Sequence, residues 1–365
     1  MDGRAPPRSG AYPVTSGQLI DRLLDWYDAH RRALPWRATP SRRPEPYHVL
    51  LSEIMLQQTT VATAAGRFDA FLARFPSFEA LAAADQSEVL HEWQGLGYYR
   101  RARCLHACAR VVVEQYDGQL PRSERALREL PGIGAYTARA ILAIAFDQAV
   151  VPVDANVARV LVRLHGIEAP LPGAQKALHE RAAALASRSR SGDVAQALMD
   201  LGAVVCRSGR PHCAQCPWRP GCVAYAAGSA ERLPRRPRKP ERPIRRGVAF
   251  LLTRADGGML FRRRPENGLL GGLHELPSSP WLDGPLRLEE ALGHAPVTTA
   301  WRLRPDPVIH GFTHFVLELT LGEAATDQPP DGIWCRPDRL HELALPTVMK
   351  KLLRLAGHRG RSTNR

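Results

Sequence analysis

The stretch Leu130-Pro-Gly-Ile-Gly-Ala-Tyr-Thr-Ala138 decides how this chain folds. Pro131 ends the apolar segment before it, because proline has no N–H and restricts the residue that precedes it. Gly132 and Gly134 allow a hairpin that is too tight for side chains. From Ala135 small and apolar residues recur at helical spacing, so we expect a helix to begin there with its positive end toward the hairpin.

Backbone amides in such a hairpin form an anion site. An apolar run then leads to Asp154-Ala-Asn156, where N-cap residues are expected before the helical spacing of VARVLVRL. The chain has 50 Lys and Arg against 36 Asp and Glu and a net charge of +14, which favours a DNA phosphate as the anion. The alternative is an ordinary helix-turn-helix with a capping aspartate.

Length and composition point to two or three domains in 365 residues. No apolar run approaches the ~20 residues of a membrane span, and the N-terminal stretch lacks the apolar core of a signal peptide. The seven cysteines are an odd number, which favours metal or cluster ligation over disulfides. We therefore expect a monomer in a reducing compartment, the cytoplasm, associated with the nucleoid and not with a membrane.

The chain's texture changes at a basic, proline-rich segment, ERLPRRPRKPERPIRR, which cannot bury a core and predicts a linker over residues 231–246. Residues 17–230 before it are almost wholly helical in pattern. After it, apolar or alternating runs predict strands, and Leu343 to Leu355 predicts a closing helix, so residues 247–356 form an α+β domain. Residues 1–16 and 357–365 are expected to be tails. The predicted strands are Val248 to Thr253, Met259 to Phe261, Phe312 to Thr320 and Gly332 to Cys335.

The most specific chemical signal is the spacing Cys206-x6-Cys213-x2-Cys216-x5-Cys222. Four thiolates in so short a loop, residues 206–222, can converge on one centre. Structural Zn²⁺ and a [4Fe–4S] cluster both accept such a set, and spacing alone favours zinc as the commoner occupant.

A second signal is Glu53, which sits in the apolar run HVLLSEIML. A carboxyl group in apolar surroundings is disfavoured in its charged form, so its pKa should rise toward that of a general acid at neutral pH. The alternative is a solvent-facing glutamate on an amphipathic helix.

A third signal is WQGLGYYRRAR, residues 93–103, where two glycines predict a sharp turn that carries Leu96 and Tyr98. Apolar and aromatic tips beside arginines suit insertion between base steps, with phosphates held nearby. Aromatic core packing beside a solvated basic helix is the alternative.

Taken together, these features resemble the endonuclease III superfamily of DNA glycosylases, over roughly residues 18–226. Within it the closer resemblance is to adenine DNA glycosylases that remove adenine mispaired with 8-oxoguanine. The resemblance implies an all-α helix-hairpin-helix glycosylase domain with a [4Fe–4S] cluster, and not zinc, at the four cysteines. It rests on the cysteine spacing and on the motifs LPWR, PYHVLLSEIMLQQTTVAT, WQGLGYYRRAR, LPGIGAYTARAI, VDANVARVL and ALMDLGAVVC.

The resemblance also implies roles for single residues. Glu53 would protonate the leaving adenine, and Asp154 would stabilise the sugar cation or bond to it covalently. Tyr136 and Asn156 would position these groups. Arg37 and Gln196 would line the adenine pocket. Gln58, Leu96 and Tyr98 would probe an A·8-oxoguanine or A·G mispair in double-stranded DNA. Gly132 and Gly134 would present amides to a phosphate.

The C-terminal domain resembles the Nudix-like domain with which these glycosylases recognise 8-oxoguanine, through RPENGLLGG, HELP and GFTHF. Phe312, Thr313 and His314 would contact the damaged base. Leu270 stands where a tryptophan is usual and Thr313 where a serine is usual. Threonine keeps the hydroxyl, so we expect that contact to survive.

Three rival functions differ from this one by single features. An endonuclease III-like lyase would need a lysine where Tyr136 stands, because a phenol cannot form an imine. A DNA-binding protein without catalysis would not need both Glu53 and Asp154. A nucleotide pyrophosphohydrolase would need a helix of clustered carboxylates after Gly272, which the sequence lacks.

Overall fold

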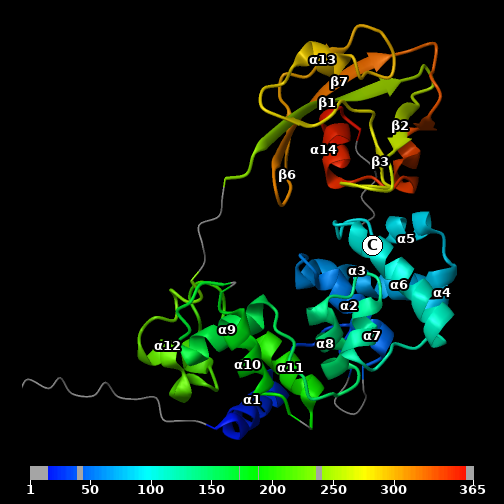
Figure 1. Cartoon of the computed structure of the whole chain (residues 1–365). Coiled ribbons are helices and arrows are strands. Elements are labelled where there is room, and N and C mark those ends of the chain that lie inside the picture. Colours follow the sequence, from blue (N-terminus) through cyan, green and yellow to red (C-terminus); the bar gives the residue numbers. More distant parts are fainter. Residues whose placement is uncertain (1–14, 39–43, 172, 188, 236–240, 359–365) are drawn as a thin grey trace, which may run out of the picture. The chain divides into compact units, whose positions relative to one another are not determined.

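The computed structural model describes residues 15–38, 44–171, 173–187, 189–235 and 241–358. The chain divides into two compact units, one of Met1–Ala82 with Ala107–Arg238 and one of Ala83–His106 with Lys239–Arg365. Figure 1 colours them along the sequence. Most of the predicted tails and residues 236–240 of the predicted linker lie outside the described residues.

The described part of the first unit is helical, as the sequence pattern predicts. One helix, α6 (Arg100–Tyr116), belongs partly to each unit, because the division falls between His106 and Ala107. The helices of the first unit are α1 (Ser16–His30), α2 (Pro46–Leu56), α3 (Val61–Arg74), α4 (Phe78–Ala83), α7 (Glu124–Glu129), α8 (Ala135–Ile144), α9 (Ala155–His165), α10 (Gln175–Ala183), α11 (Ser191–Asp200) and α12 (Val223–Ala226).

Side-chain caps fix where several of these helices begin. Thr15 and Gln18 form a reciprocal capping box at the start of α1. Thr60 accepts from the Thr63 amide at the start of α3. Asp154 caps α9, which ends at Gly166 in the left-handed conformation with φ of 63°. The local sequence therefore sets these boundaries before any tertiary packing.

The predicted hairpin is confirmed between α7 and α8. Gly132 has a φ of 79°, a conformation that suits glycine, and Gly134 is the N-cap of α8, which begins at Ala135. The Ile133 amide donates to the Leu130 carbonyl at 3.2 Å. Ile133 is buried and anchors the hairpin from inside.

The core of this unit is shared by α1, α9 and α11. Leu23, Leu161 and Leu198, one from each helix, are fully buried in one apolar cluster. Trp218 joins the same cluster, and its indole N–H donates to the Leu19 carbonyl at 2.8 Å. The loop that carries the cysteines is thus attached to the first helix.

The second unit is built on a mixed sheet with the order β3-β2-β1-β7-β5. The two long strands β1 and β7 are parallel, and Ile244 pairs with Val316. β4 pairs with β1, β6 with β7 and β8 with β2. The strands are β1 (Ile244–Thr253), β2 (Met259–Arg263), β3 (His274–Glu275), β4 (Leu282–Asp283), β5 (Arg302–Leu303), β6 (Val308–Gly311), β7 (Val316–Ala325) and β8 (Ile333–Cys335); the helices are α5 (Gln86–Glu92), α13 (Leu288–Leu292) and α14 (Thr347–Leu355).

Both faces of this sheet are covered. Ala249 and Leu251 of β1 belong to the cluster that contains the apolar face of α14. Val248 and Phe250 point to the opposite face, where they pack with Ala291 of α13. Side chains alternate along a strand, so a nearly continuous apolar run in β1 serves two cores.

Two strand boundaries differ from those that the sequence suggested. β1 begins at Ile244, within the predicted linker, because Arg245 and Arg246 pair with Asp283 and Glu318 across the sheet. The predicted strand from Phe312 to Thr320 is instead a turn followed by β7. The Phe312 amide donates to the Phe315 carbonyl at 2.8 Å and closes that turn between β6 and β7.

Close packing of α8 against α11 gives a first testable prediction. A Cβ added at Gly192 would lie 2.9 Å from the Ala143 carbonyl oxygen and 3.2 Å from Ile144 Cα, and these backbone atoms cannot move aside cheaply. We expect Gly192→Ala to lower the free energy of unfolding by about 1–3 kcal/mol, as overpacking does. Thermal or urea unfolding of the full chain measures this.

Gly66→Ala is the matched control. Gly66 lies inside α3, is exposed, and a Cβ there would meet no atom within 4 Å. We expect this change to raise the stability by roughly 0.5–1 kcal/mol, because alanine favours the helix over glycine. Equal effects of the two substitutions would contradict the packing argument.

Candidate active site

Glu53 lies on α2 among apolar side chains. The helix begins at Pro46, a position where proline fits the first turn. Glu53 is 7% exposed, and Leu50 and Leu51 beside it are fully buried. The carboxyl group is therefore held away from water, as the apolar run around it predicts.

Three other groups act on this carboxyl. The pKa of Glu53 is raised to about 7, chiefly by burial. The hydrogen bond from the Tyr136 hydroxyl and the positive charge of Arg37 lower this pKa, whereas the negative charge of Asp154 raises it. The structure thus brings Glu53, Tyr136, Asp154 and Arg37 into one cluster. A carboxyl group with a pKa near 7 can hold a proton at neutral pH and release it to a substrate.

Tyr136 lies on α8, which packs against α2. Burial raises its pKa well above 10, and the charges of Glu53 and Asp154 raise it further. The phenol therefore stays protonated and serves as a hydrogen-bond donor to Glu53.

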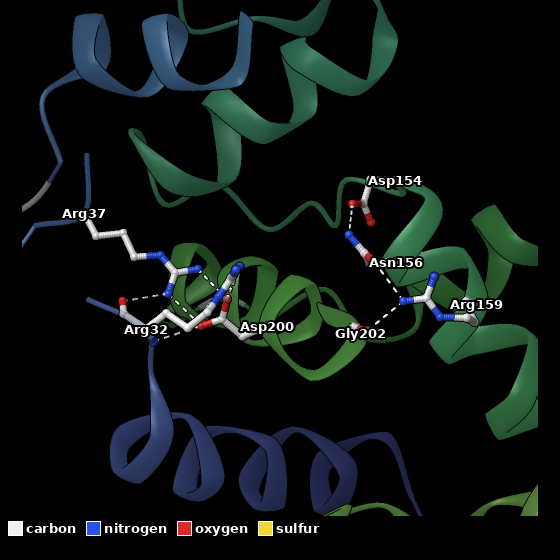
Figure 2. Close-up of polar contacts among 7 residues, drawn as sticks. All are labelled: Arg32, Arg37, Asp154, Asn156, Arg159, Asp200 and Gly202. Atoms are coloured by element: carbon white, nitrogen blue, oxygen red, sulfur yellow. Dashed lines mark hydrogen bonds and ion pairs between the residues drawn. The ribbon is translucent and has the colours of Figure 1, made fainter. Parts of the chain in front are cut away.

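Asp154 lies at the start of α9, where both of its carboxylate oxygens accept hydrogen bonds. Oδ2 accepts from the Asn156 side-chain amide at 2.9 Å (Figure 2). Oδ1 accepts from the Val157 backbone amide at 2.7 Å. Donors of this kind favour the charged form of a carboxyl group. Asp154 thus has a hydrogen-bond donor on each carboxylate oxygen and lies close enough to Glu53 to act on its charge.

Asn156 is held in turn by Arg159. The Arg159 Nη2 donates to Asn156 Oδ1 at 2.8 Å and to the Gly202 carbonyl at 2.6 Å (Figure 2). Its Nε donates to the Cys206 carbonyl at 2.8 Å. A continuous set of hydrogen bonds therefore runs from Asp154 to the first cysteine of the loop.

Arg37 lies in the loop after α1, and its guanidinium is bound end-on by Asp200 of α11. Nη1 donates to Oδ2 at 2.6 Å and Nη2 to Oδ1 at 2.8 Å, and Arg32 Nε also donates to Oδ1 at 2.7 Å (Figure 2). Burial alone raises the pKa of Asp200, but the hydrogen bonds and charges of Arg37 and Arg32 bring that pKa below its ordinary value. Asp200 is a buried, ionised carboxylate.

The two predicted glutamines occupy different surroundings. Gln196 is 9% exposed on α11, where its side-chain amide donates to the Gly192 carbonyl at 3.1 Å. Gln58 is exposed just after α2 with a φ of 55°, a conformation that few residues other than glycine adopt. The position of Gln58 suits contact with a partner, and that of Gln196 suits the wall of a pocket.

The hairpin leads directly into the start of α8, where backbone amides point outward along the helix axis. The first N–H groups of α8 have no partner within their own helix, as at every helix start. A Cβ built at Gly134 would meet no atom within 4 Å, so this glycine faces open space. A phosphate can approach the backbone here without meeting a side chain.

The four cysteines of residues 206–222 lie close enough for their thiols to interact. Burial raises the pKa of Cys216 to about 12, and the charges of Cys206, Cys222 and Cys213 contribute to that increase. Arg163 Nη1 donates to Cys206 Sγ at 3.3 Å. Within the described residues, no group of three or more His, Cys, Asp or Glu side chains is placed to hold a metal ion. The donor set itself, four neighbouring thiols, fits a soft cationic centre, which would offset the cost of buried thiolates.

In the second unit the turn after Trp93 is held by its own side chains. The Trp93 indole N–H and Arg101 Nη2 both donate to the Gly97 carbonyl. Leu96 is 4% exposed, whereas Tyr98 is 49% exposed with a φ of 47°. Of the three predicted probes of the mispair, Tyr98 and Gln58 are exposed and Leu96 is buried.

Within this unit Tyr98 meets the turn between β6 and β7. The Tyr98 hydroxyl hydrogen-bonds Thr313 Oγ1 at 2.7 Å. Phe312 stacks on Phe315 with a centroid distance of 4.7 Å, and His314 is exposed. Leu270 packs against the core of the sheet with a φ of 58°.

Sequence reasoning did not single out Asp200, Arg32, Arg159 or Arg163. Two signals were available. Asp200 is a charge within the apolar run ALMDLGAVV, and Arg159 and Arg163 stand four residues apart on an otherwise apolar helix. Both patterns indicate buried, paired charges.

A hairpin at a helix start, a buried acid and an adjacent aspartate define a helix-hairpin-helix DNA glycosylase. Residues 51–184 match the family model of the HhH-GPD superfamily base excision DNA repair proteins, and residues 248–355 match that of the NUDIX domain. The chain belongs to the adenine DNA glycosylase family and is a DNA N-glycosylase of base excision repair.

Individual relatives support this assignment. The chain is 36% identical to the adenine DNA glycosylase of Homo sapiens over 401 residues, which covers 91% of this chain and 73% of the relative. It is 43% identical to that of Mycolicibacterium smegmatis over 218 residues, 58% of this chain and 72% of the relative. The solved structure of a thermostable thymine-DNA glycosylase matches 58% of this chain and 97% of its own, with 32% identity and a TM-score of 0.53.

Across the described residues, no helix is both long enough and apolar enough to cross a membrane.

The raised pKa of Glu53 predicts a pH-dependent cost in stability. When the pKa of a carboxyl group is higher in the folded than in the unfolded chain, the protein loses stability as the pH rises from the ordinary pKa of 4.5 to the folded value, here about 7. We expect Glu53→Gln to gain about 2 kcal/mol over wild type between pH 5 and pH 8. Urea unfolding at the two pH values measures the difference.

Glu180→Gln, an exposed substitution on α10, is the control and should leave the pH dependence of wild type unchanged. If Glu53→Gln and wild type change in stability in parallel between pH 5 and pH 8, Glu53 does not have the raised pKa.

Proposed function

We propose that this chain hydrolytically removes adenine mispaired with 8-oxoguanine or guanine in duplex DNA, without strong strand-cleaving activity. The observation that carries the proposal is the pair of unlike carboxyl groups. Glu53 is buried with a pKa of about 7, and Asp154 accepts one hydrogen bond on each carboxylate oxygen. Glycoside hydrolysis requires such a division between acid and anion.

The reaction begins with the adenine outside the duplex, because its glycosidic bond cannot be reached within the stack. Protonated Glu53 donates to adenine N7 and the C1′–N9 bond breaks, so the bonding electrons leave with the base. The sugar becomes an oxocarbenium-like cation, which Asp154 stabilises. Water then adds to C1′ and gives its proton to Glu53, which restores the acid.

Tyr136 has two consequences for this reaction. Its hydroxyl donates to Glu53, which orients the carboxyl group. It also stands where a lyase would need an amine, and a phenol cannot form an imine with C1′. The expected product is an intact strand with an abasic site.

The second unit supports recognition of the opposite base. Phe312, Thr313 and His314 form the turn between β6 and β7, and Thr313 and His314 are exposed. In duplex DNA, Thr313 would exchange its bond to the Tyr98 hydroxyl for the damaged base. Tyr98, which is half exposed, can enter the stack at the mispair.

The four cysteines at positions 206, 213, 216 and 222 would hold a [4Fe–4S] cluster. A bound cluster would supply a cationic structural centre for the loop. The chain's own contribution is visible in the loop, where Arg163 donates to Cys206 Sγ and to two backbone carbonyls of the same segment.

A panel of duplexes tests the activity. We expect wild-type protein to release adenine from A·8-oxoguanine and A·G pairs and not from A·T. Glu53→Gln should lower the single-turnover rate about a hundred- to ten-thousand-fold, because the amide cannot donate a catalytic proton. Glu180→Gln is the control and should keep the wild-type rate. Full turnover by a folded Glu53→Gln variant would overturn the mechanism.

The same reactions separate hydrolysis from lyase chemistry. Borohydride should not trap wild-type protein on DNA, whereas Tyr136→Lys should be trapped, because a buried amine is neutral and nucleophilic. Efficient trapping of the wild type would favour a lyase instead.

Metal analysis tests the cluster. Protein purified without oxygen should contain about four iron atoms and four sulfides per chain. Cys213→Ser should lose them, and Cys335→Ser, which lies outside the loop, should keep them. Stoichiometric zinc without iron would contradict the proposal.

A further inference from the structure

Asp200 is a fully buried carboxylate that holds two arginines. Its side chain is 0% exposed, and it accepts four hydrogen bonds. Two come from the end of the Arg37 guanidinium, at 2.6 and 2.8 Å. Two come from Arg32, whose backbone amide donates at 3.2 Å and whose Nε donates at 2.7 Å. Such an end-on fork fixes the plane of the Arg37 guanidinium as well as its position.

The side edge of the Arg37 guanidinium, formed by Nε and Nη2, is left for another acceptor. Nη1 also donates to the Arg32 carbonyl at 3.2 Å, so both Nη1 hydrogens and one Nη2 hydrogen are used. Within the described part of the chain, no acceptor bonds Nε–H or the second Nη2–H of Arg37. These two donors are parallel, and a guanidinium can only donate.

This edge belongs to the neighbourhood of the catalytic acid. The charge of Arg37 acts on Glu53. Gln196 lies four residues before Asp200 on α11, so the two share one face of that helix. Arg37 therefore binds Asp200 on the face of α11 that also carries Gln196, and its charge reaches Glu53 on α2.

We propose that Asp200 is a positioning residue for base excision that acts through Arg37: it clamps the end of the guanidinium and leaves its Nε/Nη2 edge for the ring nitrogens of the flipped adenine. The inference rests on the proposed function and adds the residue that orients the pocket. Adenine ring nitrogens are acceptors, so the free edge of Arg37 is complementary to them. Without the clamp, the guanidinium can rotate away from the base.

Asp200 also balances charge near Glu53. The groups that face Glu53 are Tyr136 from α8, Asp154 from the start of α9 and Arg37. Tyr27 and Asp193 also act electrostatically on Arg37. Both are present in every variant, so they do not account for differences between the variants. Losing the Asp200 charge leaves the Arg37 cation uncompensated, and this lowers the pKa of Glu53.

The test is the single-turnover rate of adenine release from an A·8-oxoguanine duplex between pH 5 and 9. It compares wild type with Asp200→Asn, Arg37→Gln and the double variant. We expect Asp200→Asn to lower the rate about ten- to a hundred-fold, the scale for a misplaced contact. Its activity should also fall at a lower pH than that of wild type, because Glu53 loses its proton earlier.

The double variant identifies the route. If Asp200 acts through Arg37, the double variant should behave like Arg37→Gln alone. Its rate should lie within about two-fold of that variant's rate, and its pH dependence should be the same. Should Asp200→Asn alone fail to fold, this comparison remains, because the double variant removes both buried charges. The proposal would be overturned if Asp200→Asn slowed the Arg37→Gln variant by the same factor by which it slows the wild type.

Arg32→Gln is the matched control from the same cluster. It removes one ion pair of Asp200 and leaves both Arg37 bonds intact, so it should lower thermal stability without shifting the pH dependence. A shift equal to that of Asp200→Asn would mean a purely structural role for the cluster. A wild-type protein that releases no adenine would refute the proposed function, whereas an active wild type with an unchanged Asp200→Asn would refute this inference alone.

Discussion

The removal of one carboxyl group from water is the constraint on which the rest of the glycosylase unit depends. Glu53 is surrounded on α2 by residues that are themselves buried, so little solvent reaches its carboxyl group to stabilise the charge. Desolvation alone would keep the acid protonated and unable to accept a proton back. The Tyr136 hydroxyl and the Arg37 cation oppose this effect and keep the pKa of Glu53 at about 7. The packing of α8 on α2 and the loop after α1 therefore serve a chemical purpose as well as a structural one.

Much of this arrangement follows from local sequence. The hairpin depends on glycine at position 132 and on the helix start at Ala135. These two features are only three positions apart in the sequence, so a local pattern reveals both. The burial of Glu53 followed from the apolar residues beside it. Asp154 stands before a run at helical spacing and does cap α9. Patterns of this kind are set by short-range physics, which a single sequence displays.

The pairing of Asp200 with Arg37 could not be read in this way. The two residues are 163 positions apart, and nothing in either neighbourhood names the other. The same holds for Arg159 and the carbonyl of Cys206, which are 47 positions apart. Composition also misplaced the start of β1, because Arg245 and Arg246 look unsuited to a strand until their carboxylate partners across the sheet are known. Long-range charge pairing is the part of the fold that sequence patterns conceal.

Three carboxyl groups in one unit thus acquire three properties from their surroundings. Glu53 has one hydroxyl donor and little water, so it exchanges a proton near neutral pH. Asp154 has an amide donor on each oxygen. Asp200 has two arginines and no solvent, and its pKa lies below its ordinary value. Because the side chains are chemically alike, the donors that each helix end and loop supply decide which one is acid, which is anion and which is anchor. The glycosylase chemistry is therefore a property of how α2, α8, α9 and α11 are placed around one acid, more than of the acid itself.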